Sequence, residues 1–153
     1  MDEQNIEYSR TQDAPRWVVT LASLFAIVVF SLITALARSE EGSAGLVLFS
    51  IVWITVVYLA VLSMTRMTIR ITPTTIELTW RLGWPNKSIE RASIVTAMPH
   101  RNHWLAGWGI RLVSRGWMWN VWGLDSVLLE LDNGRVFRIG SDDVPGLLTA
   151  LGR

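Results

Sequence analysis

Two long uncharged segments near the start of the chain most constrain its fold. Residues 17–37 and 45–64 contain 21 and 20 residues, and none of them is charged. An α-helix rises about 1.5 Å per residue, so each segment reaches about 30 Å, the thickness of the hydrocarbon core of a bilayer. We therefore expect a hairpin of two transmembrane helices, with residues 38–44 as the loop between them.

The composition of these segments favours an anchor over a transport path. Neither contains Asp, Glu, Lys, Arg or His, which ion paths and proton relays normally need. Their Ser and Thr hydroxyls can bond back to their own helix or across to the other helix. The whole chain lacks cysteine, which excludes disulfides and thiolate metal sites.

The arginines at the helix ends predict the orientation of the hairpin. The four that flank its outer ends are Arg10, Arg16, Arg66 and Arg70. The loop between the helices has only Arg38, beside two glutamates. Because cytoplasmic flanks carry the excess of Lys and Arg, we expect both termini and the C-terminal region in the cytoplasm, with the chain a multi-pass protein of the inner (cytoplasmic) cell membrane.

Three residues at the outer helix ends are expected to act as interfacial anchors: Arg16, Trp17 and Arg66. One alternative concerns the first helix, because Ala35-Leu36-Ala37 resembles a signal-peptidase site. The acidic residues before the helix and the length of its apolar stretch favour an uncleaved helix, and cleavage stays open as the alternative. Residues 1–16 are polar and without periodicity, so we expect a disordered or loosely helical tail.

From residue 66 onward the apolar period changes to two. Met67, Ile69 and Ile71 alternate with polar residues, and a similar alternation follows a turn at Pro73. Such segments continue through residues 66–153, which predicts a mainly-β domain of about seven short antiparallel strands in a sandwich or open barrel. A C-terminal α-helix is expected to cover one open end.

The end of the chain gives the sharpest local predictions. Asp132-Asn133-Gly134 is a turn, and a three-residue loop with Gly134 left-handed pairs Leu129 with Phe137 and Val127 with Ile139. We prefer this register because it places four apolar residues on one face. The segment 141–145 then opens a helix, capped by a hydroxyl or carboxylate oxygen, with Leu147, Leu148 and Leu151 as its apolar stripe.

These motifs resemble those of bacterial pleckstrin-homology-like (PH-like) domains. The resemblance rests on Gly107-Trp108-Gly109-Ile110-Arg111, on Leu131-Asp132-Asn133-Gly134-Arg135 and on the run from Ile139 to Pro145. More narrowly, the chain is similar to small bacterial membrane proteins that carry two helices before such a domain and are largely of unknown function. The resemblance implies a helix-capped, seven-stranded sandwich without enzymatic activity or cofactor. Phosphoinositide binding is not carried over, because Arg70, Arg81 and Lys87 are dispersed.

Residues capable of acid–base or metal chemistry are few. His100 and His103 have a spacing that can hold a metal, but no third ligand lies nearby in the sequence, so no metal site is expected. Adjacent Asp142 and Asp143 are explained by a helix cap. We therefore expect no catalytic residues and no enzyme, and the resemblance implies that no cofactor is bound.

A tryptophan-rich band is the most suggestive feature. Trp104, Trp108, Trp117, Trp119 and Trp122 lie close to three arginines. In one interpretation Trp108, Trp117 and Trp119 fill the core, and if Trp117 and Trp119 point inward, Met118 and Trp122 tend outward. In the other, some rings form an interface patch. The candidate contact residues are Arg101, Trp104, Arg111, Arg115 and Trp122.

These observations predict a membrane-anchored, non-catalytic interaction module. Its expected contacts are the bilayer, a membrane-protein partner or a second copy of the chain, and not nucleic acid. The alternative is a lipid-headgroup or small-ligand site in the loops around residues 100–116. Residues 66–153 carry 11 Lys and Arg against 7 Asp and Glu, a net charge of +4 that suits an anionic surface without proving contact with one.

Overall fold

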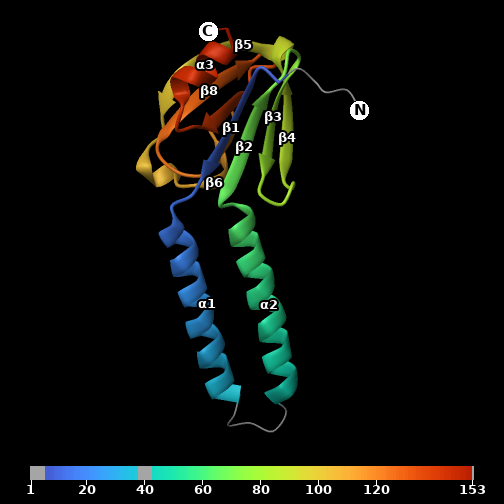
Figure 1. The fold of residues 1–153 in the computed structure, drawn as a ribbon, viewed down its shortest axis with the longest axis vertical. Coiled ribbons are helices and arrows are strands. Elements are labelled where there is room, and N and C mark those ends of the chain that lie inside the picture. The colour runs from blue at the N-terminus through green and yellow to red at the C-terminus, as the bar shows by residue number, and fades with distance from the viewer. Residues whose placement is uncertain (1–5, 38–42, 153) are drawn as a thin grey trace.

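The computed structural model describes residues 6–37 and 43–152 of the chain. Two long helices, α1 (Arg16–Ala37) and α2 (Ser43–Ser63), run side by side, and a mainly-β domain lies at one end of the pair (Figure 1). Both helices are long and apolar enough to cross a membrane. Most of the predicted loop lies outside the described residues, so the orientation inferred from Arg38 stays a prediction.

The hydroxyl groups of the helices bond as predicted, both within a helix and across the pair. Thr20 Oγ1 donates to the carbonyl oxygen of Arg16 at 3.2 Å. Ser23 Oγ donates to the carbonyl oxygen of Val19 at 2.8 Å and lies 3.0 Å from the hydroxyl of Tyr58 on α2. The outward side chains of both helices are apolar and exposed, a surface that is favourable in hydrocarbon and unfavourable in water.

The prediction of a disordered or loosely helical N-terminal tail is wrong for most of the described residues before α1, because Tyr8–Asp13 form strand β1. β1 pairs antiparallel with β2 (Arg66–Ile71), from Tyr8 opposite Ile71 to Asp13 opposite Arg66. The strand lies at the edge of its sheet and exposes most of its side chains, so its sequence lacks the apolar alternation that marks a half-buried strand. The β domain therefore includes residues that precede the first helix.

Two sheets form the β domain. The first has the order β1-β2-β3-β4, with β3 at Thr75–Trp80 and β4 at Asn86–Glu90. The second has the order β5-β8-β9-β7-β6. Its strands are β5 (Ile94–Arg101), β6 (Gly109–Val113), β7 (Gly116–Asn120), β8 (Asp125–Leu131) and β9 (Val136–Gly140). Two short 3₁₀ turns, η1 (Arg91–Ser93) and η2 (Trp104–Ala106), flank β5.

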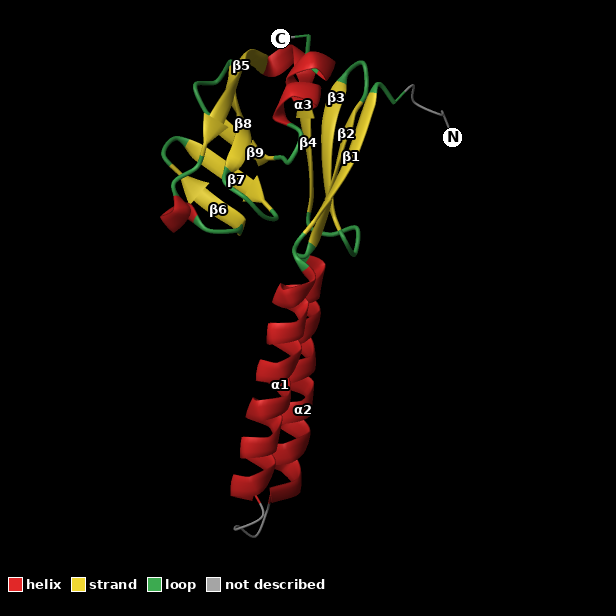
Figure 2. Cartoon of the chain, turned by 60° about the vertical axis from the view of Figure 1, so that its left-hand side comes forward, coloured by secondary structure: helices red, strands yellow, loops and turns green. Residues whose placement is uncertain are grey.

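This architecture agrees with the predicted two-layer arrangement and differs in two details. Nine strands occur within residues 6–37 and 43–152, where about seven were expected. β7 and β9 also pair in parallel, whereas antiparallel pairing was expected throughout. The helix α3 (Val144–Ala150) lies at the end of the sandwich farthest from α1 and α2 (Figure 2).

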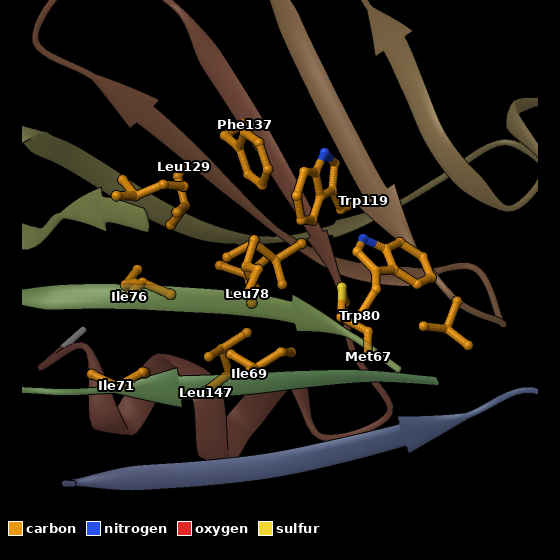
Figure 3. Close-up of a cluster of buried hydrophobic side chains, with 14 residues drawn as sticks. Met67, Ile69, Ile71, Ile76, Leu78, Trp80, Trp119, Leu129, Phe137 and Leu147 are labelled. Carbon is orange, nitrogen blue, oxygen red and sulfur yellow. The ribbon is translucent and has the colours of Figure 1, made fainter. Parts of the chain in front are cut away.

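The core lies between the sheets, where the alternating residues of β2 and β3 face β8 and β9. Ile69 and Leu78 point toward the side of the core that holds Leu129 and Phe137 (Figure 3). Leu147 of α3 is fully buried in the same cluster. Burial of large apolar side chains of this kind supplies most of the stabilisation of a small domain.

The predictions for the end of the chain are confirmed. Leu129 pairs with Phe137 and Val127 with Ile139, while Gly134 has a φ of 73°. The Asp143 carboxylate caps α3 by accepting from the backbone N–H of Gly146 at 3.0 Å. This local sequence chemistry fixes the register of the last hairpin and therefore the position of the closing helix.

Backbone hydrogen bonds connect the segments where the β domain meets the two long helices. The N–H of Ala14, just before α1, donates to the carbonyl oxygen of Thr65, just after α2, at 2.7 Å. The N–H of Arg81 donates to the carbonyl oxygen of Arg66 at 2.9 Å and to that of Ser63 at 3.3 Å. The end of the β domain that meets α1 and α2 is called the helix-proximal end below, and the end that carries α3 is called the helix-distal end.

Candidate functional site

Two loops present exposed apolar side chains at the helix-proximal end. The first is the β3–β4 loop, residues 81–85, whose Trp84 is 76% exposed. The second is the η2 loop, residues 102–108, whose Trp104 is 70% exposed. Leu82 and Leu105 are also exposed. In Figures 1 and 2 both loops lie on the side of the β domain that faces the helices.

The β3–β4 loop reaches this end because of strand direction. Trp80, the last residue of β3, pairs with Met67 near the start of β2, which directly follows α2. The next segment is Leu82-Gly83-Trp84-Pro85, and Gly83 has a φ of 78°, which suits glycine in a tight turn. A tryptophan between such turn residues has no strand to place it in the core. The sequence analysis missed Trp84, although this turn signal could have identified it.

A cluster of three tryptophans, Trp17, Trp108 and Trp122, joins the η2 loop to α1. The rings of Trp108 and Trp122 stack with centroids 4.2 Å apart and planes at 17°. Trp17, the second residue of α1, meets Trp122 edge-on at 5.2 Å and 85°. Trp17 and Trp108 remain half exposed, so the cluster is a surface feature at the level where the helix pair begins.

The candidate contact residues do not form one site. Trp104 and Trp122 both lie at the helix-proximal end, and the Nε of Arg111 donates to the carbonyl oxygen of Trp108 at 3.2 Å. Arg101 ends β5 opposite Asp125. Arg115 occupies the β6–β7 turn, at the opposite end of β6 from Trp108, with a positive φ of 65°. The structure therefore separates Arg115 from the others.

The core interpretation of the tryptophan band is wrong for two rings and correct for one. Trp119 is buried, at 6% exposure, between Trp80 and Phe137. Trp108 and Trp117 are about half exposed instead. Trp117 lies near the start of β7, next to the edge strand β6. It is not part of the buried core cluster.

Met118 also departs from the expected alternation, because it is fully buried although it lies on the outer face of the sheet. It stands in register between Arg111 of β6 and Arg138 of β9. The aliphatic part of an arginine side chain can cover an apolar neighbour while its guanidinium stays at the surface. Long cationic side chains can thus bury a residue that a simple alternation rule places in solvent.

The three predicted anchors lie together at the helix-proximal end. Arg16 opens α1, beside Trp17, and Arg66 opens β2. The guanidinium of Arg66 donates to both carboxylate oxygens of Asp13, with distances of 2.6 and 3.2 Å. This hydrogen bond and the charge of Asp13 raise the pKa of Arg66 above its ordinary value. A cleft of about 590 Å³ lies among Asp13, Arg16, Arg66 and Arg81.

Two ion pairs and a tyrosine–carboxylate hydrogen bond lie at the helix-distal end. The Tyr8 hydroxyl donates to Asp143 Oδ2 at 3.1 Å, and Arg10 forms an ion pair with Asp142 at 2.8 Å. Arg91 forms an ion pair with Glu7. Arg10 lowers the pKa of Asp142, while burial and the Asp143 carboxylate raise the pKa of Tyr8 to about 12. These contacts hold β1 against α3.

Of the two histidines, only His103 has a side-chain hydrogen bond within the described residues. His103 Nδ1 accepts from the N–H of Leu105 at 3.3 Å and so caps η2. Burial and nearby Arg138 lower the pKa of His100, which keeps it neutral at pH 7. His100, Arg101 and Asp125 line an open cavity of about 300 Å³, and Arg111 is not part of its lining. In the part of the chain that the structure describes, no three His, Asp or Glu side chains cluster as a metal site requires.

Comparison with known proteins gives no relative from which a role could be transferred. No protein-family model matches the chain, and no curated protein matches it. The function must therefore be argued from the site itself.

Proposed function

We propose that this chain is a membrane-anchored, non-catalytic interaction module whose β domain rests on the bilayer surface with its helix-proximal end. One observation carries the proposal. The exposed Trp and Leu side chains of the β3–β4 loop and the η2 loop lie at the same end as the start of α1 and the end of α2. If those helices span the bilayer, both loops are at the level of the lipid headgroups and upper acyl chains.

Energetics support this placement. An apolar side chain of the size of Leu gains about 1.5–3 kcal/mol when it leaves water completely, and tryptophan rings are enriched at membrane interfaces. Trp84 and Leu82 are exposed on one loop, and Trp104 and Leu105 on the other. A shallow insertion of both loops would satisfy these four side chains together. It would also fix the tilt of the β domain, because the loops lie in different sheets.

The remaining parts of the proposal follow from the sequence. The arginine bias places the β domain on the cytoplasmic side of the inner membrane. The two sheets and the closing helix support the PH-like assignment, while the parallel β7–β9 pair departs from what the resemblance implied. A scaffold of this kind, with exposed apolar side chains gathered in two loops at one end, is suited to presenting a surface rather than to catalysis.

The absence of cysteine gives a direct test in the full-length chain. Single substitutions Trp84→Cys, Leu82→Cys and Leu105→Cys introduce sites for a spin label at the helix-proximal end. Thr74→Cys, in the exposed β2–β3 turn, provides the matched helix-distal label. In lipid nanodiscs, the proximal labels should be more accessible to oxygen than to a water-soluble nickel chelate, and the distal label should show the reverse. Equal exposure to the chelate at all four positions would contradict the proposal.

A second candidate function is supported by a groove that is lined mainly by β7 and the β8–β9 hairpin, with one residue from each of the edge strands β4 and β6. The groove has a volume of about 320 Å³, and its apolar wall includes Trp117 and Phe137. Lys87 and Arg135 also line it. In the described sheets β4 and β6 each have one unpaired edge, to which an extended peptide can add. We propose an acidic, extended protein segment as the occupant. Trp117→Ser should abolish its binding, measured in membranes by crosslinking from a photoreactive residue at position 133, which also lines the groove.

A further inference from the structure

The cleft at the helix-proximal end has the features of an anion site. It lies between the first turns of α1 and the start of β2, and it is called the arginine cleft after Arg16, Arg66 and Arg81. We propose that the arginine cleft binds the phosphate-bearing headgroup of an anionic phospholipid. The inference rests on the proposed placement of α1 and α2 in a bilayer, and it names a lipid class that this placement alone does not require.

The charge of the cleft is the first argument. Three arginines face one carboxylate, Asp13, so the lining has a net charge of +2. Asp13 is already paired with Arg66. Within residues 6–37 and 43–152, neither Arg16 nor Arg81 forms an ion pair with a carboxylate. A phosphate in the cleft would supply the negative charge that these two side chains lack.

Preorganisation is the second argument. The Nη1 of Arg81 donates to Thr65 Oγ1 at 3.3 Å, and the backbone of Arg81 is bonded to Ser63 and Arg66. Arg66 is held by its two bonds to Asp13. Each guanidinium has five N–H donors in a planar fork, so donors remain for a phosphate after these contacts. Two of the three arginines are therefore already oriented at the cleft.

The depth of the cleft favours a lipid over a soluble anion. Its lining on α1 runs from Arg16 through Val19 to Ser23, which is about 10 Å along the helix axis. Beyond Arg16 this lining is Val19, Thr20 and Ser23, so the deeper part has no additional cation. The two hydroxyls donate to carbonyl oxygens of their own helix. A headgroup phosphate would lie at the level of the arginines, with the glycerol beside Val19 and the acyl chains beside the exposed apolar side chains of α1.

The test uses the full-length chain in nanodiscs of phosphatidylcholine with and without phosphatidylglycerol. Native mass spectrometry counts the anionic lipids that remain bound after mild delipidation. A cation near a membrane surface contributes roughly a factor of five in affinity. We therefore expect Arg16→Gln and Arg81→Gln each to reduce retention of phosphatidylglycerol by about fivefold. Arg81→Lys should keep part of the affinity, since it keeps the charge and loses the fork.

Two charge-matched variants sharpen the test. Asp13→Asn removes the only carboxylate of the cleft lining, so retention should rise by about fivefold. Asp142→Asn breaks a comparable exposed ion pair at the helix-distal end and should leave retention unchanged. Thermal unfolding of each variant verifies that it is folded. Equal retention by the wild type and all of these variants would overturn the inference.

Two further measurements separate the possible reasons for failure. The spin-labelled variants described above report whether the loops contact the bilayer, so unchanged loop depth with no lipid preference would overturn the lipid site alone. Isothermal titration of the detergent-solubilised chain with inorganic phosphate and glycerol phosphate distinguishes the source of the phosphate. Weak or absent binding of these anions is expected, and affinity equal to that of the phospholipid would overturn the assignment to a lipid.

Discussion

The two ends of the β domain satisfy their polar and apolar groups in opposite ways. At the helix-distal end, Arg10 of β1 forms an ion pair with Asp142, just before α3, and Arg91 forms one with Glu7. At the helix-proximal end, tryptophans are exposed and arginines exceed carboxylates. The helix-distal end makes these contacts within the chain, whereas in our proposal the helix-proximal end makes its contacts with lipid. This difference directs attention to the helix-proximal end as the functional surface.

The largest expected effect compares a buried with an exposed leucine. Leu129 is fully buried between the sheets, and Leu82 is exposed in the β3–β4 loop. Leu129→Ala should lower the free energy of unfolding by about 2–5 kcal/mol, because it removes apolar contacts and leaves a cavity. Leu82→Ala should change it by about 0.5 kcal/mol or less. Chemical unfolding of the detergent-solubilised chain, followed by circular dichroism, measures both. A similar loss from Leu82→Ala would mean that the loop belongs to the folded core.

The tryptophans of the helix-proximal end should also differ in how much they contribute to the free energy of unfolding. Trp122 contacts the rings of both Trp17 and Trp108, and an aromatic pair contributes about 0.5–1.5 kcal/mol beyond its burial. We expect Trp122→Ser to lower the free energy of unfolding by about 1–3 kcal/mol. Trp104→Ser should leave stability within about 0.5 kcal/mol and should instead move the η2 loop toward water. The label at Leu105→Cys reports that movement in nanodiscs. Unchanged depth would show that Trp104 does not hold the loop at the bilayer.

The predictable parts of this structure are those whose conformation is determined by residues close to one another in the sequence. The uncharged length of α1 and α2, the Gly134 turn that sets Leu129 opposite Phe137, and the Asp143 cap each depend on residues within a short span. In those places the period of the apolar residues and the turn chemistry agree with the final fold.

The parts that were not predictable depend on contacts distant in sequence. β1 is recognised as a strand only from its partner, since Thr11 pairs with Thr68 across 57 residues and the two helices. The arginine cleft also depends on residues distant in sequence, since Arg81 lies near Arg16 only because β3 returns to the helix-proximal end. Arg81 was visible only as one of several dispersed cations in the sequence. Alternation also failed for Met118, which charged neighbours flank.

The third prediction concerns the contact of β1 with α3. The Tyr8 hydroxyl donates to Asp143, and the pKa of Tyr8 is raised to about 12. A raised pKa means that the folded state favours the neutral phenol, so the stabilisation is complete below pH about 10 and is lost as the pH rises through 12. Tyr8→Phe should cost about 1 kcal/mol at neutral pH, the contribution of one hydrogen bond. Unfolding at pH 8 and pH 11 should then show a steeper loss for the wild type than for Tyr8→Phe. Parallel losses would mean that Tyr8 does not couple β1 to α3.

The smallest expected effect comes from the ion pair at the same end. Arg10 lowers the pKa of Asp142, so its contribution to stability is present above the unfolded pKa of about 3.9 and is lost as the pH falls through the lower folded value. Both side chains are nearly half exposed, and solvent screening makes the contribution of such a pair to stability small. Asp142→Asn should therefore lower stability slightly at pH 7 and leave it equal to that of the wild type near pH 2. Added salt should shrink the difference at pH 7, because exposed charges are screened. A difference in stability that persists at acid pH would mean that Asp142 acts through its hydrogen bonds and not through its charge. The helix-distal end would then depend less on charge neutralisation than the comparison of the two ends requires.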